Sequence, residues 1–439
     1  MLKVCKFGGT SCADEFQFKK VKDIILQDPS REIVVVSAPG KRSASDYKIT
    51  DLLFLTHSHI KYKVDYTPVF NQIKERYKGI AKALKLDIDL DREFDALEAK
   101  MKSGIKEEEL VSRGEYFSAL LMAKYLGYTF VDSKDIIHFT YEGKIDVEKT
   151  SRAVQEVYNR HGKMVVPGFY GAYPNGSICL FSRGGSDVTG SYLAKALKVS
   201  LYENWTDVSG ILMTDPKIVP NPRKIKEVSY AELRELSYLG ASVLHEETIF
   251  PIAEERIPIN ILNTNKPEEE GTLIKRHSED KSFILTGITG KKNFIALTFV
   301  KKNASSKLDV MLQVLNVFKK FEVPVEHVPT SIDSFSIVCE KTKIEDRFYD
   351  IVSEIRKNTD IISISQDDDI ALVAVVGQNM VKKAGISGRI LSTFGKNDIN
   401  IKLIAQGREE LNIIVGISNK DFNKSIQALY NDYAFEKVD

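Results

Sequence analysis

The chain has 439 residues, which is long enough for about two to four domains with cores of their own. Apolar residues make up 43% and charged residues 28%, so the composition excludes a disordered or fibrous chain. Lysine and arginine number 62 against 61 aspartates and glutamates, and the resulting net charge of +1 provides no positive field for a nucleic-acid partner.

The cysteines, the N-terminus and the apolar runs indicate a protein of a reducing, aqueous compartment. The four cysteines are scattered without a CxxC pair, which fits neither a zinc ribbon nor a disulfide framework. The first residues, MLKVCKFGGTS, predict a strand and a turn instead of the apolar core and cleavage site of a signal peptide. No apolar stretch reaches the roughly 18 residues that suggest a membrane span. We therefore expect a cytoplasmic protein without a membrane partner.

The first 280 residues predict an α/β fold with a mostly parallel sheet sandwiched by helices. Runs rich in β-branched residues alternate there with helical patterns: LKVCKF, EIVVVSAP, YTFVD, MVVPGF, SICLF, SLYENW and PINILN. Residues 33–36 are apolar at successive positions, as expected for a central strand buried on both faces. Residues 52–127 have a mostly helical pattern and are expected to shape one side of a substrate cleft.

A polar stretch over residues 266–282 separates this region from a second pattern. The chain is therefore expected to contain an N-terminal domain over residues 1–280, a linker over 281–292 and a C-terminal region over 293–439. In that last region two small α+β units of ferredoxin-like βαββαβ type follow one another as an internal repeat.

The repeat is expected to divide into one unit at about 305–369 and another at about 370–439, with strand 293–300 available to complete the second. The predicted strands are 294–300, 325–331, 334–340, 361–366, 371–377, 399–406 and 411–417. The predicted helices are 308–321, 345–358, 381–397 and one that begins near residue 422.

Two glycine pairs stand at predicted strand-to-helix turns and are candidates for binding an anion. In KFGGTS, residues 6–11, backbone N–H groups can approach an anion at the start of the first helix, with a lysine beside them. The motif is not a Walker A loop, and a bare glycine pair is more often only a turn. In SRGGSD, residues 182–187, Ser186 or Asp187 can act simply as a helix N-cap. Arg183 favours a binding role, because its planar fork suits a carboxylate or a phosphate.

Two further polar loops follow predicted strands: WTDVSG at 205–210 and TDPK at 214–217. Loops at the carboxyl ends of parallel strands converge on one crevice. Together KFGGTS, VSA, a helical GE, RGGSD and WTDVSG resemble the aspartate kinases of the amino-acid kinase superfamily, and the C-terminal repeat is similar to their tandem ACT domains. The resemblance spans essentially the whole chain. It implies an ATP-dependent enzyme that converts L-aspartate to 4-phospho-L-aspartate, the first step toward lysine, threonine and methionine.

The resemblance also implies roles for residues on the substrate side of a catalytic N-terminal domain. Lys6 resembles the catalytic lysine that neutralises charge on the transferring phosphoryl group, and Asp187 resembles the acid that orients that lysine. Arg183 and Glu115 resemble the groups that hold the α-carboxylate and α-amino group of aspartate, although a helical glutamate by itself is usually a solvated surface residue. The remaining substrate-binding positions that it implies are Ser37, Ala38, Thr50, Gly184, Gly185 and Ser186.

On the nucleotide side, the chain departs from the family pattern at three positions. Leu212 stands where many members have tyrosine, Lys217 where arginine is more usual, and Ser242 where a lysine is common. These departures bear on ATP binding and leave the reaction class unchanged. The seven histidines form no paired metal-ligand spacing, so we expect Mg²⁺ to arrive with ATP and to be held through the phosphates, with no site made by protein side chains alone. The implied ATP-binding positions are Lys6, Gly8, Gly9, Ser11, Thr206, Asp207, Leu212, Lys217, Ser242 and Val243.

The ACT-like repeat implies feedback regulation by lysine, threonine or both, and a homodimer or homotetramer formed through these units. Pro324 and His327 depart from the family pattern near the effector site. Because the chain ends directly after the second unit, we expect a monofunctional enzyme without the dehydrogenase domain of bifunctional relatives. The implied effector-binding positions are Ser305, Ser306, Met311, Val325, Thr330 and Ser331.

Two alternatives stay open at the level of sequence. The first is another kinase of the same superfamily, acting on a carboxylate, a carbamate or a nucleoside monophosphate; Arg183 with Glu115 favours an amino-acid zwitterion instead. The second is a non-catalytic, ligand-sensing ACT protein on a decayed kinase fold, which the unusual residues Leu212 and Ser242 would suggest. Retention of the lysine, the aspartate and the arginine of the two glycine-rich motifs argues against such decay.

Overall fold

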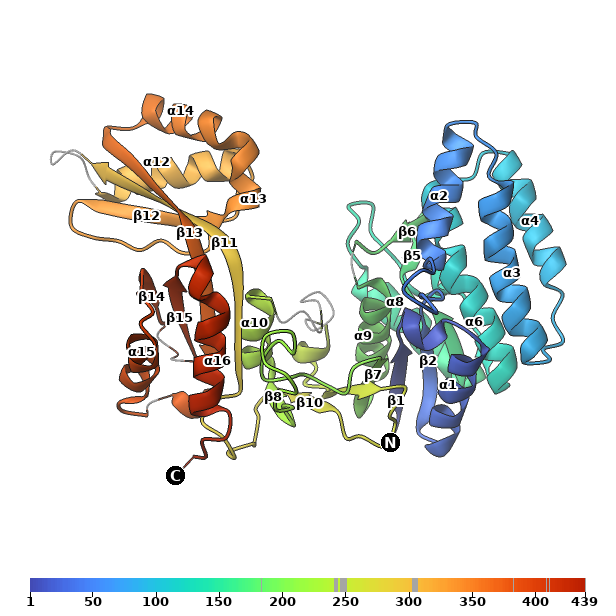
Figure 1. The fold of residues 1–439 in the computed structure, drawn as a ribbon. Coiled ribbons are helices and arrows are strands. Elements are labelled where there is room, and N and C mark those ends of the chain that lie inside the picture. The colour runs from blue at the N-terminus through green and yellow to red at the C-terminus, as the bar shows by residue number, and fades with distance from the viewer. Residues whose placement is uncertain are drawn as a thin grey trace. The chain divides into compact units, whose positions relative to one another are not determined.

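The computed structural model describes residues 1–182, 184–240, 244, 251–301, 307–381, 383–407, 409 and 411–438. The chain divides into two compact units, each with its own sheet and its own apolar core (Figure 1). The first unit comprises Met1–Ile211, Lys226–Tyr230 and Val243–Ser278; the second comprises Leu212–Ile225, Ala231–Ser242 and Glu279–Asp439.

The first unit contains an eight-stranded sheet with the strand order β3-β4-β2-β1-β7-β9-β10-β8. Neighbouring strands are parallel except for the antiparallel pair of β9 and β10, so the predicted mostly parallel sheet is confirmed. Residues 33–36 of β2 are fully buried, as their continuous apolar run predicted. The strands are β1 (Lys3–Phe7), β2 (Arg31–Val36), β3 (Thr129–Phe130), β4 (Met164–Pro167), β7 (Leu201–Thr206), β8 (Glu227–Ser229), β9 (Ile259–Asn263) and β10 (Thr272–Lys275).

The run SICLF does not join this sheet. Its residues form β6 (Ile178–Leu180), which pairs only with β5 (Tyr170–Ala172) in a separate antiparallel ribbon among the described residues. The turn between them is short, so the run folds back on the preceding strand before a crossover helix can form.

Helices cover both faces of the large sheet (Figure 1). Helices α1 and α6 pack on one face, whereas α9 packs on the other face and α8 packs against α9. Outside α1 and α6, an extra helical layer shares a core of aromatic rings that includes Phe70, Tyr77, Phe94 and Phe117. The helices are α1 (Glu15–Gln27), α2 (Ile49–Lys61), α3 (Thr67–Ala83), α4 (Leu90–Lys102), α5 (Glu107–Val111), α6 (Arg113–Leu126), α7 (Ser133–Ile136), α8 (Val147–His161) and α9 (Gly185–Leu197).

The first α-helix begins close to its predicted start near Ala13, and it does not begin directly at the glycine pair. The glycine pair leads into a 3-10 turn, η1 (Gly9–Cys12), and α1 begins only at Glu15. The side chain of Asp14 accepts a hydrogen bond from the backbone N–H of Gln17 at 2.9 Å, and glycine offers no such cap. The turn at Gly8, a candidate for anion binding, is therefore not the N-terminus of an α-helix.

The second unit contains a five-stranded antiparallel sheet with the order β12-β11-β13-β15-β14. The strands are β11 (Gly287–Lys301), β12 (Ser334–Glu340), β13 (Ile361–Val376), β14 (Leu403–Ala405) and β15 (Asn412–Ile417). The helices are α10 (Tyr230–Tyr238), α12 (Lys307–Lys320), α13 (Lys341–Ile344), α14 (Phe348–Asn358), α15 (Ile386–Lys396) and α16 (Phe422–Tyr433), with 3-10 turns η2 (Glu345–Arg347), η3 (Gln378–Met380) and η4 (Asn419–Asp421).

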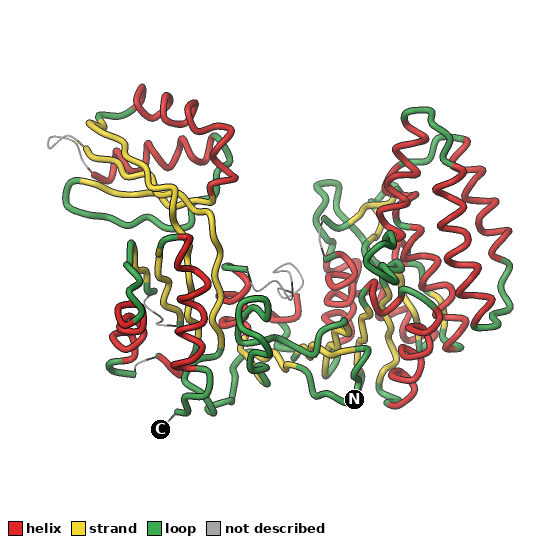
Figure 2. Tube along the Cα trace, in the orientation of Figure 1, coloured by secondary structure: helices red, strands yellow, loops and turns green. Residues whose placement is uncertain are grey.

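Two long strands join the halves of this repeat. Residues 294–300 of β11 pair with β12, whereas residues 287–291 of the same strand pair with residues 372–376 of β13. One half contains α12 and α14 and the other contains α15 and α16, as Figure 1 and Figure 2 show. Each half has an apolar core of its own. The segment predicted as a linker over 281–292 thus already contains the start of a sheet strand.

Several predicted strands of the repeat are shorter in the structure. Residues 325–331 approach β12 only through isolated bridges at His327 and Thr330. The prolines on either side of His327 lack the N–H that a continuous ladder needs, which accounts for the interruption. The strand predicted over 399–406 is limited to β14.

Two segments that precede residue 281 pack within the second unit. The backbone N–H of Ile288 donates to the carbonyl of Met213 at 2.7 Å, and the backbone N–H of Arg223 donates to the hydroxyl of Tyr430 at 2.8 Å. Buried Glu232 of α10 accepts a hydrogen bond from the backbone N–H of Gln378 at 2.9 Å. None of the helices described is long and apolar enough to cross a membrane.

Candidate active site

An ion pair between Lys6 and Asp187 lies at the centre of the candidate site. Lys6 is in β1, and Asp187 is in the first turn of α9, which packs on that strand. Their Nζ and Oδ1 atoms are 2.6 Å apart, and Lys6 is only 7% exposed. Asn204, directly opposite Lys6 in the neighbouring parallel strand β7, donates its Nδ2–H to the same Asp187 oxygen at 2.9 Å. The carboxylate therefore fixes the direction of the buried ammonium group.

A pocket of about 330 Å³ opens beside this pair. Ser37 follows β2, and its hydroxyl donates to the hydroxyl of Ser186 at 2.9 Å, which ties the end of β2 to the start of α9. Gly184 has a left-handed conformation with φ of +57°, so the chain can turn sharply into the helix. The pocket is lined by Lys6, Ser37, Lys48, Thr50, Glu115, Phe169, Gly184, Gly185, Ser186 and Asp187.

Glu115 contributes a buried carboxyl group to this pocket from α6. Its Oε1 accepts a hydrogen bond from the backbone N–H of Ala38 at 3.1 Å, whereas its Oε2 has no hydrogen-bond partner among the described residues. Burial raises the pKa of Glu115 from its ordinary value to about 8. A buried carboxyl with one unused oxygen suits a ligand that brings its own positive charge, such as an ammonium group.

The turns that follow β1 and β2 touch each other at Gly9 and Gly40. The backbone N–H of Gly40 donates to the carbonyl of Gly9 at 2.7 Å. A Cβ atom on Gly40 would lie 2.7 Å from the carbonyl carbon of Gly9, which is closer than real side chains approach. Only glycine at position 40 therefore allows this crossing.

Polar groups at the ends of three neighbouring strands make a second cluster in the same unit. Ser11 follows β1, Thr206 ends β7, and Thr264 follows β9. The hydroxyl groups of Ser11 and Thr264 are hydrogen-bonded at 2.8 Å, and the backbone N–H of Thr264 donates to the carbonyl of Thr206 at 2.8 Å. Gly8 is held beside this cluster, because its N–H donates to the carbonyl of Trp205 at 3.1 Å. Donors and hydroxyls at strand ends are suited to a phosphorylated ligand.

The structure brings together most of the residues that the sequence selected for the substrate side. Ala38 contacts Glu115 through its N–H and does not itself line the pocket. Of the nucleotide side, Thr206 and Asp207 belong to the first unit, with their side chains 3.2 Å apart. Leu212 and Lys217 belong to the second unit. Five predicted site residues lie outside the described residues: Arg183, Ser242, Val243, Ser305 and Ser306.

The structure also places residues at the site that the sequence reasoning did not select. Lys48 and Phe169 line the pocket, and Asn204 holds Asp187. Phe169 has a φ of +79°, an uncommon conformation for a bulky residue, and its N–H donates to the hydroxyl of Thr189 at 3.1 Å. The clearest missed signal was Asn204, since a polar side chain buried in a central strand calls for a partner.

Comparisons with known proteins agree with this geometry. The sequence matches the amino acid kinase family over residues 1–263 and an ACT domain family over residues 373–433. It is 32% identical to aspartokinase 3 of Bacillus subtilis over 98% of both chains, and 26% identical to lysine-sensitive aspartokinase 3 of Escherichia coli over 98% of both chains. The crystal structure of Clostridium acetobutylicum aspartate kinase is similar with a TM-score of 0.91 and 43% identity, covering 99% of this chain and 100% of that one.

The chain therefore belongs to the amino acid kinase family, and within that family to the aspartokinases. It is an ATP-dependent aspartate kinase whose C-terminal region is ACT-like. The two alternatives that the sequence left open, another phosphotransferase of the superfamily and a non-catalytic sensor, are thereby set aside.

Proposed function

We propose that the pocket around Lys6 and Asp187 is where the γ-phosphoryl group of ATP passes to the β-carboxylate of L-aspartate. The 2.6 Å ion pair between these two side chains, beside a pocket with a buried carboxyl group, is the observation that carries the proposal. Phosphoryl transfer depends mainly on positioning and on neutralising the charge of the transferring group. Lys6 supplies a cation whose direction Asp187 and Asn204 fix, so little reorganisation is needed when the phosphoryl group leaves ATP.

Glu115 gives the pocket its preference for an amino acid. Its unused Oε2 accepts a hydrogen bond from the α-ammonium group of aspartate, and Arg183 holds the α-carboxylate through its planar fork. Ser37 and Thr50, together with Lys48, then face the β-carboxylate that is phosphorylated. Glutamate is longer by one methylene group, so the same anchors would misplace its γ-carboxylate.

ATP lies with its phosphates toward Gly8, Gly9 and the Ser11 to Thr264 hydroxyl pair. The structure of E. coli aspartokinase III in complex with aspartate and ADP has the same fold, with a TM-score of 0.77 at 24% identity. Mg²⁺ enters with the nucleotide and is held through the phosphates. Within the described residues no group of three His, Cys, Asp or Glu side chains could hold a metal ion.

The second unit senses lysine as an end product. The E. coli relative is named lysine-sensitive, and a structure of E. coli aspartokinase III contains lysine and aspartate. In this chain, Met311 and Val325 pack against the same apolar core, whereas Thr330 and Ser331 are exposed beside the start of β12. Threonine, the other candidate effector, has no comparable support.

The sheet of the second unit ends in β14 on one side and in β12, which His327 and Thr330 partly bridge, on the other; pairing at such edges would join two chains in a homodimer or, with further contacts, a homotetramer. The four cysteines are free and buried, which agrees with a cytoplasmic setting.

Trapping the product with hydroxylamine tests the proposed reaction. Purified protein with Mg-ATP and L-aspartate should form aspartyl hydroxamate, and L-glutamate or UMP in place of aspartate should give only background. Comparable turnover with glutamate would contradict the role of the zwitterion anchors. The Asp207→Asn and Thr206→Ala variants should raise the KM for ATP and leave the KM for aspartate nearly unchanged.

A further inference from the structure

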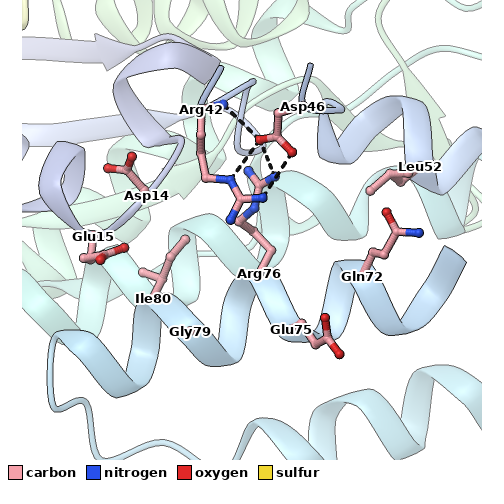
Figure 3. Close-up of a pocket in the computed structure, with 10 residues that line it drawn as sticks. All are labelled: Asp14, Glu15, Arg42, Asp46, Leu52, Gln72, Glu75, Arg76, Gly79 and Ile80. Atoms are coloured by element: carbon pink, nitrogen blue, oxygen red, sulfur yellow. Dashed lines mark hydrogen bonds and ion pairs between the residues drawn. The ribbon is translucent and has the colours of Figure 1, made fainter. Parts of the chain in front are cut away.

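A second pocket of about 200 Å³ lies between the loop at residues 40–48 and helix α3 (Figure 3). It is lined by Asp14, Glu15, Arg42, Asp46, Leu52, Gln72, Glu75, Arg76, Gly79 and Ile80. Four carboxylates against two guanidinium groups do not suit an anionic ligand. Both arginines of this pocket, Arg42 and Arg76, donate hydrogen bonds to the carboxylate of Asp46.

Arg76 is almost completely buried, with a side chain only 6% exposed. From α3, its Nη1 donates to the carbonyl oxygens of Ala13 at 3.2 Å and Gly40 at 3.1 Å, and its Nη2 donates to Oδ2 of Asp46 at 2.7 Å. Burying a guanidinium group is costly unless each contact is well made. Arg76 thus links the turn after β1, the turn after β2 and the following loop.

Arg42 also donates hydrogen bonds to the carboxylate of Asp46. Its Nε donates to Oδ2 of Asp46 at 2.9 Å, its Nη2 donates to Oδ1 at 3.1 Å, and its backbone N–H donates to Oδ2 at 2.9 Å. Figure 3 shows both guanidinium groups converging on Asp46. The side-chain hydrogen bonds from Arg42 contribute most to holding the pKa of Asp46 well below its ordinary value, and the backbone N–H of Arg42 and the charge of Arg76 lower it further. The carboxylate is therefore charged throughout the working pH range.

The loop that carries Arg42 and Asp46 connects two parts of the substrate pocket. It begins at Gly40, whose N–H is bonded to Gly9, and it ends at Lys48, which lines the pocket together with Thr50. Residues 41–45 are exposed to solvent, so the loop has few apolar contacts to fix its course. The hydrogen bonds from Arg42 and Arg76 to Asp46 therefore fix the course of the loop in place of apolar contacts.

We propose that Arg42, Asp46 and Arg76 are positioning residues of the aspartate kinase, which hold the loop at 40–48 so that Lys48 and Thr50 face the substrate. The inference rests on the proposed assignment of the substrate pocket. The group is not catalytic, because it lies in a separate pocket and acts through the loop. Removal of the Asp46 charge leaves two guanidinium groups facing each other, and their repulsion pushes the loop away from α3.

Steady-state kinetics with the full chain test this inference. Asp46→Asn should raise the KM for aspartate about tenfold, as expected for loss of charge-assisted bonds, and keep the KM for ATP within about twofold. Arg42→Lys, which keeps the charge but loses the fork, should raise the KM for aspartate by about threefold. The double variant Arg42→Ala with Asp46→Asn should be less impaired than the product of the effects of Arg42→Ala alone and Asp46→Asn alone, because it lacks the facing charges.

Glu98→Gln is the matched control. Glu98 pairs with Lys74 of the same helix α3 at 2.9 Å but does not line either pocket, so its loss should leave both KM values unchanged. An unchanged KM for aspartate in Asp46→Asn would overturn the inference, and so would an equal change in Glu98→Gln. Failure of the wild type itself to form aspartyl hydroxamate would instead overturn the proposed function, which keeps the two failures distinguishable.

Discussion

The buried carboxyl group of Glu115 should make aspartate binding strongly dependent on pH. Only the ionised form attracts the α-ammonium group, and burial raises the pKa of Glu115 to about 8. Between pH 6 and pH 8 the ionised fraction of such a group rises from about 1% to about 50%. The kcat/KM for aspartate should therefore rise more than tenfold over this interval and level off above pH 8.5.

The same carboxyl group should reduce stability as the pH rises. Its pKa is raised from 4.5 to about 8, a change that corresponds to on the order of 4 to 5 kcal/mol between its charged and neutral forms. The unfolded chain loses this proton near pH 4.5, whereas the folded chain keeps it until about pH 8. The stabilising contribution is therefore fully present below pH 4.5 and is lost as the pH rises through 8. Glu115→Gln should raise the melting temperature by on the order of 5 °C at pH 8 and by almost nothing at pH 4.5.

Initial rates between pH 6 and 9, with aspartate varied at saturating Mg-ATP, measure the catalytic part of this prediction. Glu115→Gln should lower kcat/KM for aspartate by about 10² at pH 8 and give a flat profile below that pH. Glu109→Gln is a suitable control, because Glu109 pairs with Lys100 at the surface. A flat wild-type profile between pH 6 and 8, or a Gln variant with the wild-type KM, would falsify the assignment of Glu115 as the ammonium anchor.

Three further measurements probe other parts of the molecule. Lys6→Met should lower kcat by at least about 10³ with a much smaller effect on the KM for aspartate, and an unchanged kcat in the hydroxamate assay would exclude the proposed catalytic role. Gly40→Ala should cost about 2 to 3 kcal/mol in urea unfolding, because its Cβ would clash with Gly9, and wild-type stability would contradict that contact. Lysine titrated by calorimetry should bind more weakly at saturating aspartate, to the same degree that lysine weakens aspartate binding; an unchanged lysine affinity would rule out coupling between the two sites.

The sheet of the first unit could be predicted because its signals are local. Residues 33–36 are apolar without interruption, and a strand of that kind is stable only between two layers of helices. The glycine pairs marked two of the turns that meet at the pocket, since Gly184 has a left-handed conformation and a Cβ atom on Gly9 or Gly185 would crowd a neighbouring segment of the chain. What was predicted well is therefore what depends on neighbouring residues in the chain.

The contacts that could not be predicted join residues far apart in the chain. Asn204 reaches Asp187 because β7 lies beside β1, and no pattern within either segment specifies that register. Lys48 reaches the pocket because Arg76, a residue of a different helix, holds the intervening loop. A charged residue on a helix is usually solvated, so the sequence gives no reason to place Arg76 in the interior.

The boundary between the two units shows the same limit. The sequence suggested a single division near residue 280, but the segment Leu212–Ile225 packs its Met213 and Val219 into the core of the second unit. Lys217 lies in that segment, so the loop that the family resemblance assigns to ATP is attached to the ACT-like sheet by apolar burial. Any rearrangement of that sheet must move this segment with it, because a packed core transmits displacement instead of absorbing it.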